Sequence, residues 1–206
     1  MDVAYINLKP GTSKTTSAVW TAHALHELGH EVWLMDCDPA ASALRWSDLA
    51  GGFPFNVAGL PTRDVHRRAS EYGSQHAVRV YDTPHMEDHQ GIVRSVLRRA
   101  NEVLVPVAPA PIEIDRMAPV REEVRELDAV RQELPRLGVL LTRVVRSAAS
   151  GPYWRELLTE DGYDVLTNEV PSWQIFSQSF GEPVKAWSTP YQTLAEELLQ
   201  RHGEGQ

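Results

Sequence analysis

The stretch KPGTSKTT, residues 9–16, decides the fold of this chain because of what stands on either side of it. Before it, Val3–Leu8 is a nearly continuous apolar run, which predicts a strand buried on both faces. After it, Thr15–Leu28 carries apolar residues at helical spacing, and Gly29 is a fitting residue to end such a helix. A short loop between a buried strand and an amphipathic helix is the context of a phosphate-binding loop.

The chemistry of the loop supports this interpretation. Backbone N–H groups at the start of a helix point toward a bound anion, and the helix dipole adds positive potential there. Lys14 can reach the terminal phosphates of a nucleotide, and Thr15 can offer its hydroxyl to Mg²⁺. The predicted phosphate-binding residues are Pro10, Gly11, Thr12, Ser13, Lys14, Thr15 and Thr16.

Two further segments place acidic residues at the ends of apolar runs. Asp36 ends the apolar run Val32–Asp36, and Asp38 follows two residues later in the order DCDP. Carboxylates two residues apart on extended chain point the same way. Asp82 closes the run Ala77–Asp82, as does the acidic residue that holds Mg²⁺ through water in P-loop enzymes. Each segment alone is also consistent with a turn or a helix cap, and their order after the loop favours the nucleotide interpretation.

The composition suits one globular unit in a reducing compartment. The chain has 206 residues, of which 42% are hydrophobic and 23% charged, enough to bury a full core. Its one cysteine, Cys37, excludes an internal disulfide, and no basic leader or apolar run of about 20 residues is present, so we expect a cytoplasmic protein. The formal charge of −8 means that any binding to nucleic acid needs a local basic patch.

Short apolar runs alternate with helical stretches, which predicts an α/β fold: a single domain over residues 1–206 with a mostly parallel, twisted sheet flanked by helices on both faces. The predicted strands are Val3–Leu8, Val32–Asp36, Ala77–Asp82, Val103–Val107, Val139–Thr142 and a weaker Asp164–Leu166. The predicted helices are Thr15–Leu28, Ala41–Leu49, a long charged helix Glu113–Val130, Ser172–Ser179 and Thr193–Arg201. Gly51–Pro61 is predicted to be a loop with one short strand.

The loop resembles the deviant phosphate-binding loop of the ParA/MinD ATPase family, which reads Lys-Gly-Gly-x-Gly-Lys-Thr-Thr. Five positions match that pattern, namely Lys9, Gly11, Lys14, Thr15 and Thr16. The resemblance implies that Lys9 reaches across a dimer interface to the partner's nucleotide. Pro10 and Ser13 stand where the family has glycine. Pro10 has no N–H to donate, and a positive φ at Ser13 would cost about 1–3 kcal/mol, so we expect nucleotide binding to survive and hydrolysis to be slow.

The resemblance extends in order along nearly the whole chain and implies further roles. Asp36 would lie near the Mg²⁺ ion, Asp38 would orient the attacking water, and Asp82 would be the acidic residue behind the metal. After Asp82 the chain reads Thr-Pro-His, with His85 where the family has a second proline.

Later segments resemble the family as well. Thr142 and Arg143 end a late strand and would contact the base. The segment VPVAPAP, residues 105–111, resembles the proline-rich segment of small ParF-type plasmid-partition ATPases, so Pro109 is predicted to lie near the nucleotide. The segment from Ile175 to Val184 resembles the family's late Ser-Glu-Ala…Gly-x-Pro stretch.

The resemblance implies a ParA-type ATPase with ATP and Mg²⁺ as ligands. The predicted catalytic residues are Lys9, Lys14 and Asp38, and the predicted metal-binding residues are Thr15, Asp36 and Asp82. The protein would form a homodimer on ATP binding and bind DNA without sequence preference. A ParB-like or ParG-like centromere-binding partner would stimulate hydrolysis, and the protein would be nucleoid-associated, with no membrane partner.

Three alternatives stay open. A nucleotide switch would bind ATP and partners but hardly hydrolyse it, because of Pro10 and Ser13. A MinD-like membrane-cycling ATPase needs a basic amphipathic C-terminal helix, whereas Thr193–Arg201 is acidic. A small-molecule kinase could use the same loop, although Lys9 argues against it.

Two groups of arginines are candidate DNA contacts. The first, on one predicted helix, is Arg94, Arg98 and Arg99; the second is Arg143, Arg146 and Arg155. His85 and His89 are interpreted as residues of a turn and of a helix start.

Overall fold

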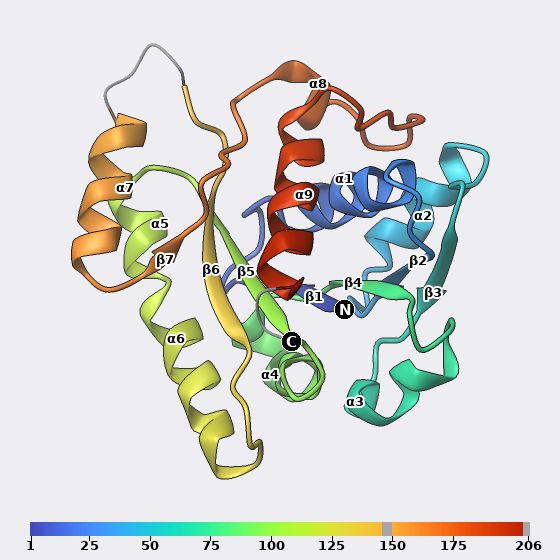
Figure 1. Ribbon diagram of the computed structural model, residues 1–206, viewed down its shortest axis with the longest axis horizontal. Helices are drawn as coiled ribbons and strands as arrows, with labels where there is room; N and C mark the ends of the chain where they lie inside the picture. The colour runs from blue at the N-terminus through green and yellow to red at the C-terminus, as the bar shows by residue number, and fades with distance from the viewer. Residues whose placement is uncertain (146–149, 204–206) are drawn as a thin grey trace.

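The apolar runs of the sequence form seven strands of one parallel sheet in the computed structural model, which describes residues 1–145 and 150–203 (Figure 1). The strand order is β3-β2-β4-β1-β5-β6-β7, and each neighbouring pair is parallel. The strands are β1 Asp2–Tyr5, β2 Val32–Asp36, β3 Asn56–Gly59, β4 Val78–Asp82, β5 Glu102–Val107, β6 Arg136–Leu141 and β7 Asp164–Val165. The predicted α/β fold class is therefore confirmed.

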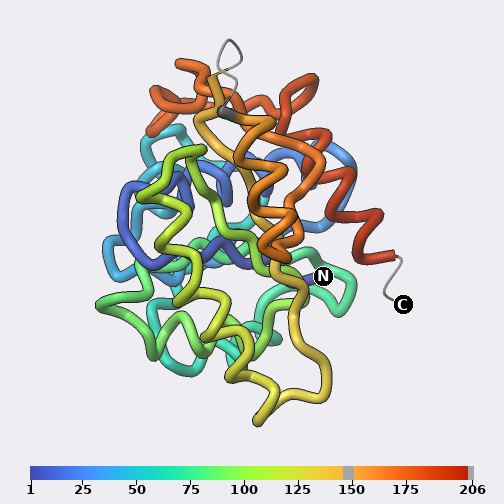
Figure 2. The backbone as a smooth tube through the Cα atoms, turned by 90° about the vertical axis from the view of Figure 1, so that its left-hand side faces the viewer, coloured from blue at the N-terminus to red at the C-terminus, as the bar shows by residue number. Residues whose placement is uncertain are grey.

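Helices cover both faces of this sheet (Figure 1). One face packs against α1, α2 and α9, and the other against α3, α4, α6 and α7. The α-helices are α1 Lys14–Glu27, α2 Ser42–Leu49, α3 Val65–Arg68, α4 Met86–Leu97, α5 Pro111–Asp115, α6 Ala118–Arg125, α7 Ser150–Glu160, α8 Gln174–Ser177 and α9 Pro190–Gly203. Two 3₁₀ turns, η1 Ala69–Glu71 and η2 Glu126–Ala129, follow α3 and α6. Figure 2 shows the α5–α6 segment and α7 on the outer side of the sheet.

Helix α1 is buried along most of its length because it lies between the sheet and α9. The ring of Trp20 in α1 stacks on Tyr191 of α9 at 5.7 Å between centroids and meets Phe176 of α8 edge-on at 4.9 Å. The Trp20 indole N–H donates to the Ser179 hydroxyl at 3.1 Å. These contacts hold the chain around α8 over α1, next to the loop that precedes this helix.

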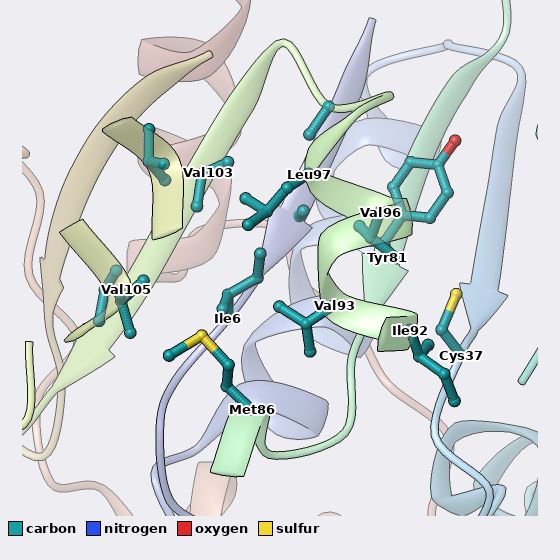
Figure 3. Packing of buried hydrophobic residues seen from close by; sticks show 14 of the residues in the cluster. Ile6, Cys37, Tyr81, Met86, Ile92, Val93, Val96, Leu97, Val103 and Val105 are labelled. Carbon is teal, nitrogen blue, oxygen red and sulfur yellow. The ribbon is translucent and has the colours of Figure 1, made fainter. Parts of the chain in front are cut away.

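The opposite face of the sheet is filled mainly by α4. Val93 and Val96 are fully buried and project from α4 toward the central strands, close to Ile6 and Tyr81 (Figure 3). Met86, at the start of α4, belongs to the same cluster. This packing fixes the position of the turn that connects β4 to α4.

The prediction of one long helix over Glu113–Val130 is wrong. The structure has α5 up to Asp115, a new helix α6 from Ala118, and a 3₁₀ turn after it. Pro119 has no N–H, and its ring would clash with the carbonyl four residues earlier, so one helix cannot run from α5 through it.

The helix predicted over Ser172–Ser179 is reduced to the single turn of α8. Ser172 instead donates its backbone N–H to the Val144 carbonyl at 2.9 Å, and Trp173 is extended. Helices α3 and α7 are present although the spacing of apolar residues did not predict them.

The carboxyl ends of β1, β2 and β4 lie side by side because these strands are parallel neighbours. Asp36 of β2 is the register partner of Asp82 of β4, and Asp82 is also paired with Tyr5 of β1. In parallel α/β sheets, ligands bind at this edge. The fold therefore brings the predicted acidic residues next to the loop that follows β1.

A stability prediction follows from His23 of α1, whose ring meets Phe53 and Phe55 edge-on at 4.8 Å each. The side chain is 3% exposed, and its Nε2 has no hydrogen-bond partner among the described residues. Burial lowers the pKa of His23 to about 4. The unfolded chain therefore takes up this proton first as the pH falls, so about 3 kcal/mol of unfolding free energy is lost between about pH 6.5 and pH 4.

Urea unfolding at pH 7 and at pH 4.5 checks this prediction in a His23→Leu variant. The variant has no imidazole to charge, so its unfolding free energy should fall less on acidification than that of the parent chain. His26→Leu, at a half-buried position of the same helix, is the matched control. Equal losses in the parent and in His23→Leu would refute the account of this residue.

Candidate functional site

The loop between β1 and α1 is anchored by buried Asn7. The Asn7 side-chain amide donates to the Pro106 carbonyl at 3.0 Å, and the Asn7 carbonyl accepts the backbone N–H of Met86 at 3.0 Å. The loop therefore begins at a point fixed by β5 on one side and by the β4–α4 turn on the other.

The backbone of the loop leaves several N–H groups without an acceptor among the described residues. Gly11 and Ser13 both have left-handed backbone, with φ of 73° and 69°. Ser17 is the first residue of α1 whose N–H is satisfied, by the Ser13 carbonyl at 2.9 Å, and no described residue accepts from the N–H groups of residues 11–16. Unsatisfied donors at a helix N-terminus form an anion-binding site.

These donors surround a cavity of about 460 Å³. Its walls consist of the loop and of side chains from the ends of neighbouring strands and helices. The lining residues are Pro10, Gly11, Thr12, Ser13, Lys14, Thr15, Thr16, Asp38, Ser42, His85 and Arg143. All seven predicted loop residues thus lie at one cavity, which we call the phosphate cavity.

A second, smaller cavity of about 130 Å³ adjoins the first, with Ser13, Thr16 and Arg143 in both walls. Its remaining walls are largely apolar and come from the end of β6 and from the chain around α8. They are Thr142, Val170, Pro171, Ser172, Trp173, Phe176, Ser177 and Tyr191. The Thr142 hydroxyl is buried and has no hydrogen-bond partner among the described residues. A largely apolar cavity next to the phosphate cavity suits a base, and the base contact predicted for Thr142 stays a prediction.

Lys14 is held inside the loop. Its side chain is largely buried, and Nζ donates to the Lys9 carbonyl at 3.2 Å. Burial lowers the pKa of Lys14, and the carboxylates of Asp82 and Asp38 offset part of that effect. A bound polyanion would replace the water that this ammonium has lost.

Asp36 and Asp38 are engaged with the backbone at the start of α2. The Asp36 carboxylate accepts from the N–H groups of Asp38 at 3.1 Å and Leu44 at 2.9 Å, and burial raises its pKa. Asp38 accepts from the Ala40 N–H at 2.9 Å and also lines the phosphate cavity. Asp36 therefore caps α2, whereas Asp38 bonds the turn before this helix and lines the phosphate cavity.

Asp82 has no such partners. It is fully buried, and neither carboxylate oxygen has a hydrogen-bond partner among the described residues. Burial and the neighbouring Asp36 carboxylate raise its pKa, while the nearby Thr15 hydroxyl and Lys14 ammonium lower it in part. An orphaned buried carboxylate is costly unless something binds it, and a hydrated cation would supply the missing partner.

The residues present fit a magnesium ion that arrives with a nucleotide. No group of three His, Cys, Asp or Glu side chains within residues 1–145 and 150–203 is placed to hold a metal by itself. Mg²⁺ in nucleotide sites is bound through one or two side chains, water and the phosphates. Thr15 and Asp82 are the side chains that meet this description.

Lys9 is placed apart from the phosphate cavity. Its Nζ donates to both carboxylate oxygens of Glu87 in α4, at 2.6 Å and 2.5 Å, and its side chain is 33% exposed. Lys9 and Lys14 thus differ: Lys14 is buried in its own loop, whereas Lys9 lies on the surface with an exposed acidic partner.

Left-handed backbone at non-glycine residues gathers around this site. Within the part of the chain that the structure describes, only Ser13, Ala41, Arg143 and Ser188 have it. Ser13 and Arg143 line the phosphate cavity, and Ala41 precedes Ser42, which lines it too. Such backbone costs about 1–3 kcal/mol at each residue and persists where surrounding structure enforces it, often at functional sites.

Some predicted residues lie elsewhere. Pro109 lines neither of the two cavities. Arg94 is paired with Glu123 and Glu126, and Arg99 with Asp2. Arg155 bonds the Leu166 carbonyl and pairs with Glu169, while Arg146 lies outside the described residues.

Other site residues were missed by sequence reasoning. Ser42 and His85 line the phosphate cavity, and Trp173 and Tyr191 line the apolar one. The substitution of His85 for the second proline of the Asp-Thr-Pro-Pro pattern was the one available signal. Trp173 and Tyr191 are distant in sequence from the loop and carried no signal.

Comparison with known proteins agrees with this geometry. Residues 3–183 match the family model of the CobQ/CobB/MinD/ParA nucleotide-binding domain. Among curated proteins no sequence matches the chain.

Solved structures share the fold over almost the full chain. Apo McdA from Cyanothece superposes with a TM-score of 0.76 at 13% identity, covering 96% of this chain and 98% of that one. A cobyrinic acid a,c-diamide synthase from Mycobacterium smegmatis, with an ATP analogue and magnesium bound, gives 0.77 at 18% identity, covering 100% and 96%. A protein described as a plasmid partition protein from Borrelia burgdorferi B31, bound to AMPPNP, gives 0.67 at 15% identity, covering 100% and 99%.

A test of the loop geometry uses Ser13→Gly. Because Ser13 has φ of 69°, glycine should relieve strain and raise the unfolding free energy by about 1 kcal/mol, measured by urea denaturation without nucleotide. Ser13→Ala keeps the unfavourable φ and should give no gain. Ser188→Gly, with φ of 60° on an exposed loop, is the matched control and should also be stabilising. A destabilised Ser13→Gly variant would show that the strain assigned to Ser13 is wrong.

Proposed function

This chain belongs to the CobQ/CobB/MinD/ParA nucleotide-binding domain family, and we propose that it is a ParA-type ATPase that forms a homodimer around ATP. ParA and MinD proteins of this family are ATPases, and the solved structures described above with an ATP analogue share its fold. The phosphate cavity, with its free loop N–H groups and buried Lys14, supports ATP as the ligand.

The observation that carries the proposed dimer is the position of Lys9. Its ammonium lies outside its own phosphate cavity, on the surface, where Glu87 holds it. Exposed ion pairs are worth about 0–1 kcal/mol, so this one can break at little cost. A second copy that brings its bound triphosphate to this surface would offer Lys9 a stronger partner.

The chain's own residues then have distinct tasks. The N–H groups of the loop and Lys14 bind and orient the phosphates, and Lys9 neutralises charge on the partner's nucleotide. Asp38 orients the attacking water beside the terminal phosphate. Bound Mg²⁺, held by Thr15 and Asp82 with Asp36 nearby, would stabilise negative charge on the phosphates. Turnover is slow for two reasons. The backbone at Ser13 is strained, and Pro10 has no N–H to donate, so the loop stabilises the transition state less well.

ATP binding and dimerisation are coupled by this arrangement. A ligand that binds the dimer more tightly than the monomer shifts the equilibrium by its differential affinity. The terminal phosphate provides that difference, since Lys9 of each copy would complete the site of the other. Hydrolysis would then release the two copies.

No helix within the described residues combines the length and the apolar character needed to cross a membrane. A MinD-like membrane cycle would instead need a free amphipathic helix at the end of the chain. The apolar side of α9 is used inside the protein, because Leu194, Ala195 and Leu198 are buried against α1. Helix α9 is therefore not free to act as a membrane-binding amphipathic helix in this structure.

The proposed dimer binds DNA through a local basic face. Among the arginines that the structure describes, the side chains of Arg45, Arg63, Arg67 and Arg98 alone make neither a hydrogen bond nor an ion pair. Three of them, Arg63, Arg67 and Arg98, lie on and beside α3 and α4, which pack together. We call this the α3–α4 arginine face. A cell-biological consequence is association with the nucleoid, where a ParB-like or ParG-like partner would stimulate hydrolysis.

The second candidate function is a nucleotide switch with little turnover, favoured by the strained backbone of Ser13. Phosphate release in the presence of DNA and partner separates the two functions. Stimulated release supports the ATPase cycle, and intact ATP binding without release supports the switch.

Replacement of Lys9 by alanine tests the proposed dimer. We expect the parent chain to be a dimer with ATP and a monomer with ADP or without nucleotide, by size-exclusion chromatography with light scattering. Lys9→Ala should remain monomeric with ATP, because each site loses the ammonium from the other copy. Lys185→Ala, at an exposed lysine that lines neither of the two cavities, is the control and should still dimerise. An ATP-dependent dimer in Lys9→Ala would contradict the role of this residue.

The DNA proposal predicts a change in salt dependence. Replacing Arg63, Arg67 and Arg98 together by glutamine should reduce the slope of log affinity against log salt by about 2–3, because each phosphate contact contributes about one unit. The control replaces Arg45, Arg125 and Lys185 by glutamine, which changes the net charge by the same amount. These three side chains are exposed outside the α3–α4 arginine face. Equal slopes in the two triple variants would exclude the α3–α4 arginine face as the DNA contact.

A further inference from the structure

His85 occupies the turn between β4 and α4, where the sequence departs from the Asp-Thr-Pro-Pro pattern. Its side chain is 25% exposed and lines the phosphate cavity together with Gly11, Ser13 and Lys14. None of the roles proposed above uses it. An imidazole in the wall of a phosphate-binding cavity is a chemically active group, so its orientation matters.

The orientation of His85 is set by Asp88, one turn along in α4. His85 Nε2 lies 2.7 Å from Asp88 Oδ2, and the hydrogen bond from His85 lowers the pKa of Asp88, which keeps that carboxylate charged. With Nε2 engaged by Asp88, Nδ1 is the nitrogen that remains for a ligand. Donation from Nδ1 to an anion, in addition to donation from Nε2 to Asp88, requires a proton on each ring nitrogen.

Several charged side chains lie around His85, and Lys14, Asp38 and Arg143 line the same cavity. His89 meets its ring edge-on at 5.4 Å, and Lys9, paired with Glu87, acts on the same Asp88 carboxylate. Lys9 is thus neutralised by its own partner in this conformation. His85 is left as the side chain of this turn that both lines the phosphate cavity and can donate to a phosphate.

The turn that carries His85 lies between Asp82 and the start of α4 and is bonded to the chain that leads into the loop. It follows Asp82 by three residues, and the N–H groups of Met86 and Glu87 donate to the carbonyls of Asn7 and Leu8, at 3.0 Å and 3.3 Å. The acidic residue after the strand and the loop threonine flank the metal that bridges the last two phosphates in P-loop enzymes. A side chain just beyond that acidic residue, lining the same cavity, would therefore lie near the end of a bound triphosphate.

We propose that His85, oriented by Asp88, donates a hydrogen bond to the terminal phosphate of a bound nucleoside triphosphate. This inference rests on the proposed function of the site. Pro10 removes one backbone donor from the loop, and the His85 imidazole adds a side-chain donor to the wall of the same cavity. Asp88 is a positioning residue that acts through His85.

The test compares the affinity of ATPγS with that of ADP by calorimetry in the presence of Mg²⁺. His85→Pro is the sharpest variant because His85 has φ of −67°, which proline adopts without strain, and its N–H has no hydrogen-bond acceptor among the described residues. We expect His85→Pro to bind ATPγS at least tenfold more weakly, as for loss of a charged hydrogen bond, and ADP within about twofold of the parent. His89→Gln, which does not line the phosphate cavity, should bind both like the parent.

Asp88→Asn gives a readout that a purely structural role would not move. In the parent with ATPγS, ¹⁵N NMR of the His85 imidazole should show protons on both nitrogens, and this signature should be lost in Asp88→Asn. Equal loss of ATPγS and ADP affinity in His85→Pro, or no loss of either, would overturn the proposal while leaving the ATP site intact. A parent chain that binds neither nucleotide would overturn the proposed function and this inference together.

Discussion

The unsatisfied backbone N–H groups of residues 11–16 are the constraint on which the rest of the site depends. They exist because β1 ends at a point fixed by Asn7 and α1 begins immediately after a left-handed Ser13. Unpaired donors are tolerated where solvent or a ligand can reach them, and here they face a cavity that also holds the dehydrated ammonium of Lys14. Only a strong anion satisfies both at once.

The acidic residues of the site make sense in the same terms. Asp82 is fully buried close to Asp36, and its two oxygens have no hydrogen-bond partner in the part of the chain that the structure describes, an arrangement that costs stability in the empty protein. A cation shared with a phosphate would relieve that cost. The loop and Asp82 at the end of β4 are thus complementary. The loop needs an anion and Asp82 needs a cation, and a magnesium nucleotide would supply both. Stability given up in the empty site would return on binding.

Much of the fold and of the candidate site could be predicted from the sequence, and the features that were not predicted have physical causes. The loop, the strand-end aspartates and the end of α1 shortly before Gly29, which has φ of 90°, follow from local patterns. Pro119 divides a helix whose charged and apolar spacing looked continuous. Trp173 joins the apolar cavity through tertiary packing of the chain around α8 on Trp20, which no local pattern encodes. The pairing of Lys9 with Glu87 likewise joins residues 78 positions apart.

The central claim is that the loop after β1 wraps the phosphates of a magnesium nucleotide. Calorimetric titration of the purified chain with ATP and Mg²⁺ tests it most directly. The account predicts saturable binding of one ATP per chain with a dissociation constant of about 1 mM or tighter, and its loss in a Lys14→Ala variant that remains folded. Absence of measurable binding by the parent chain, or unchanged binding by Lys14→Ala, would contradict the account.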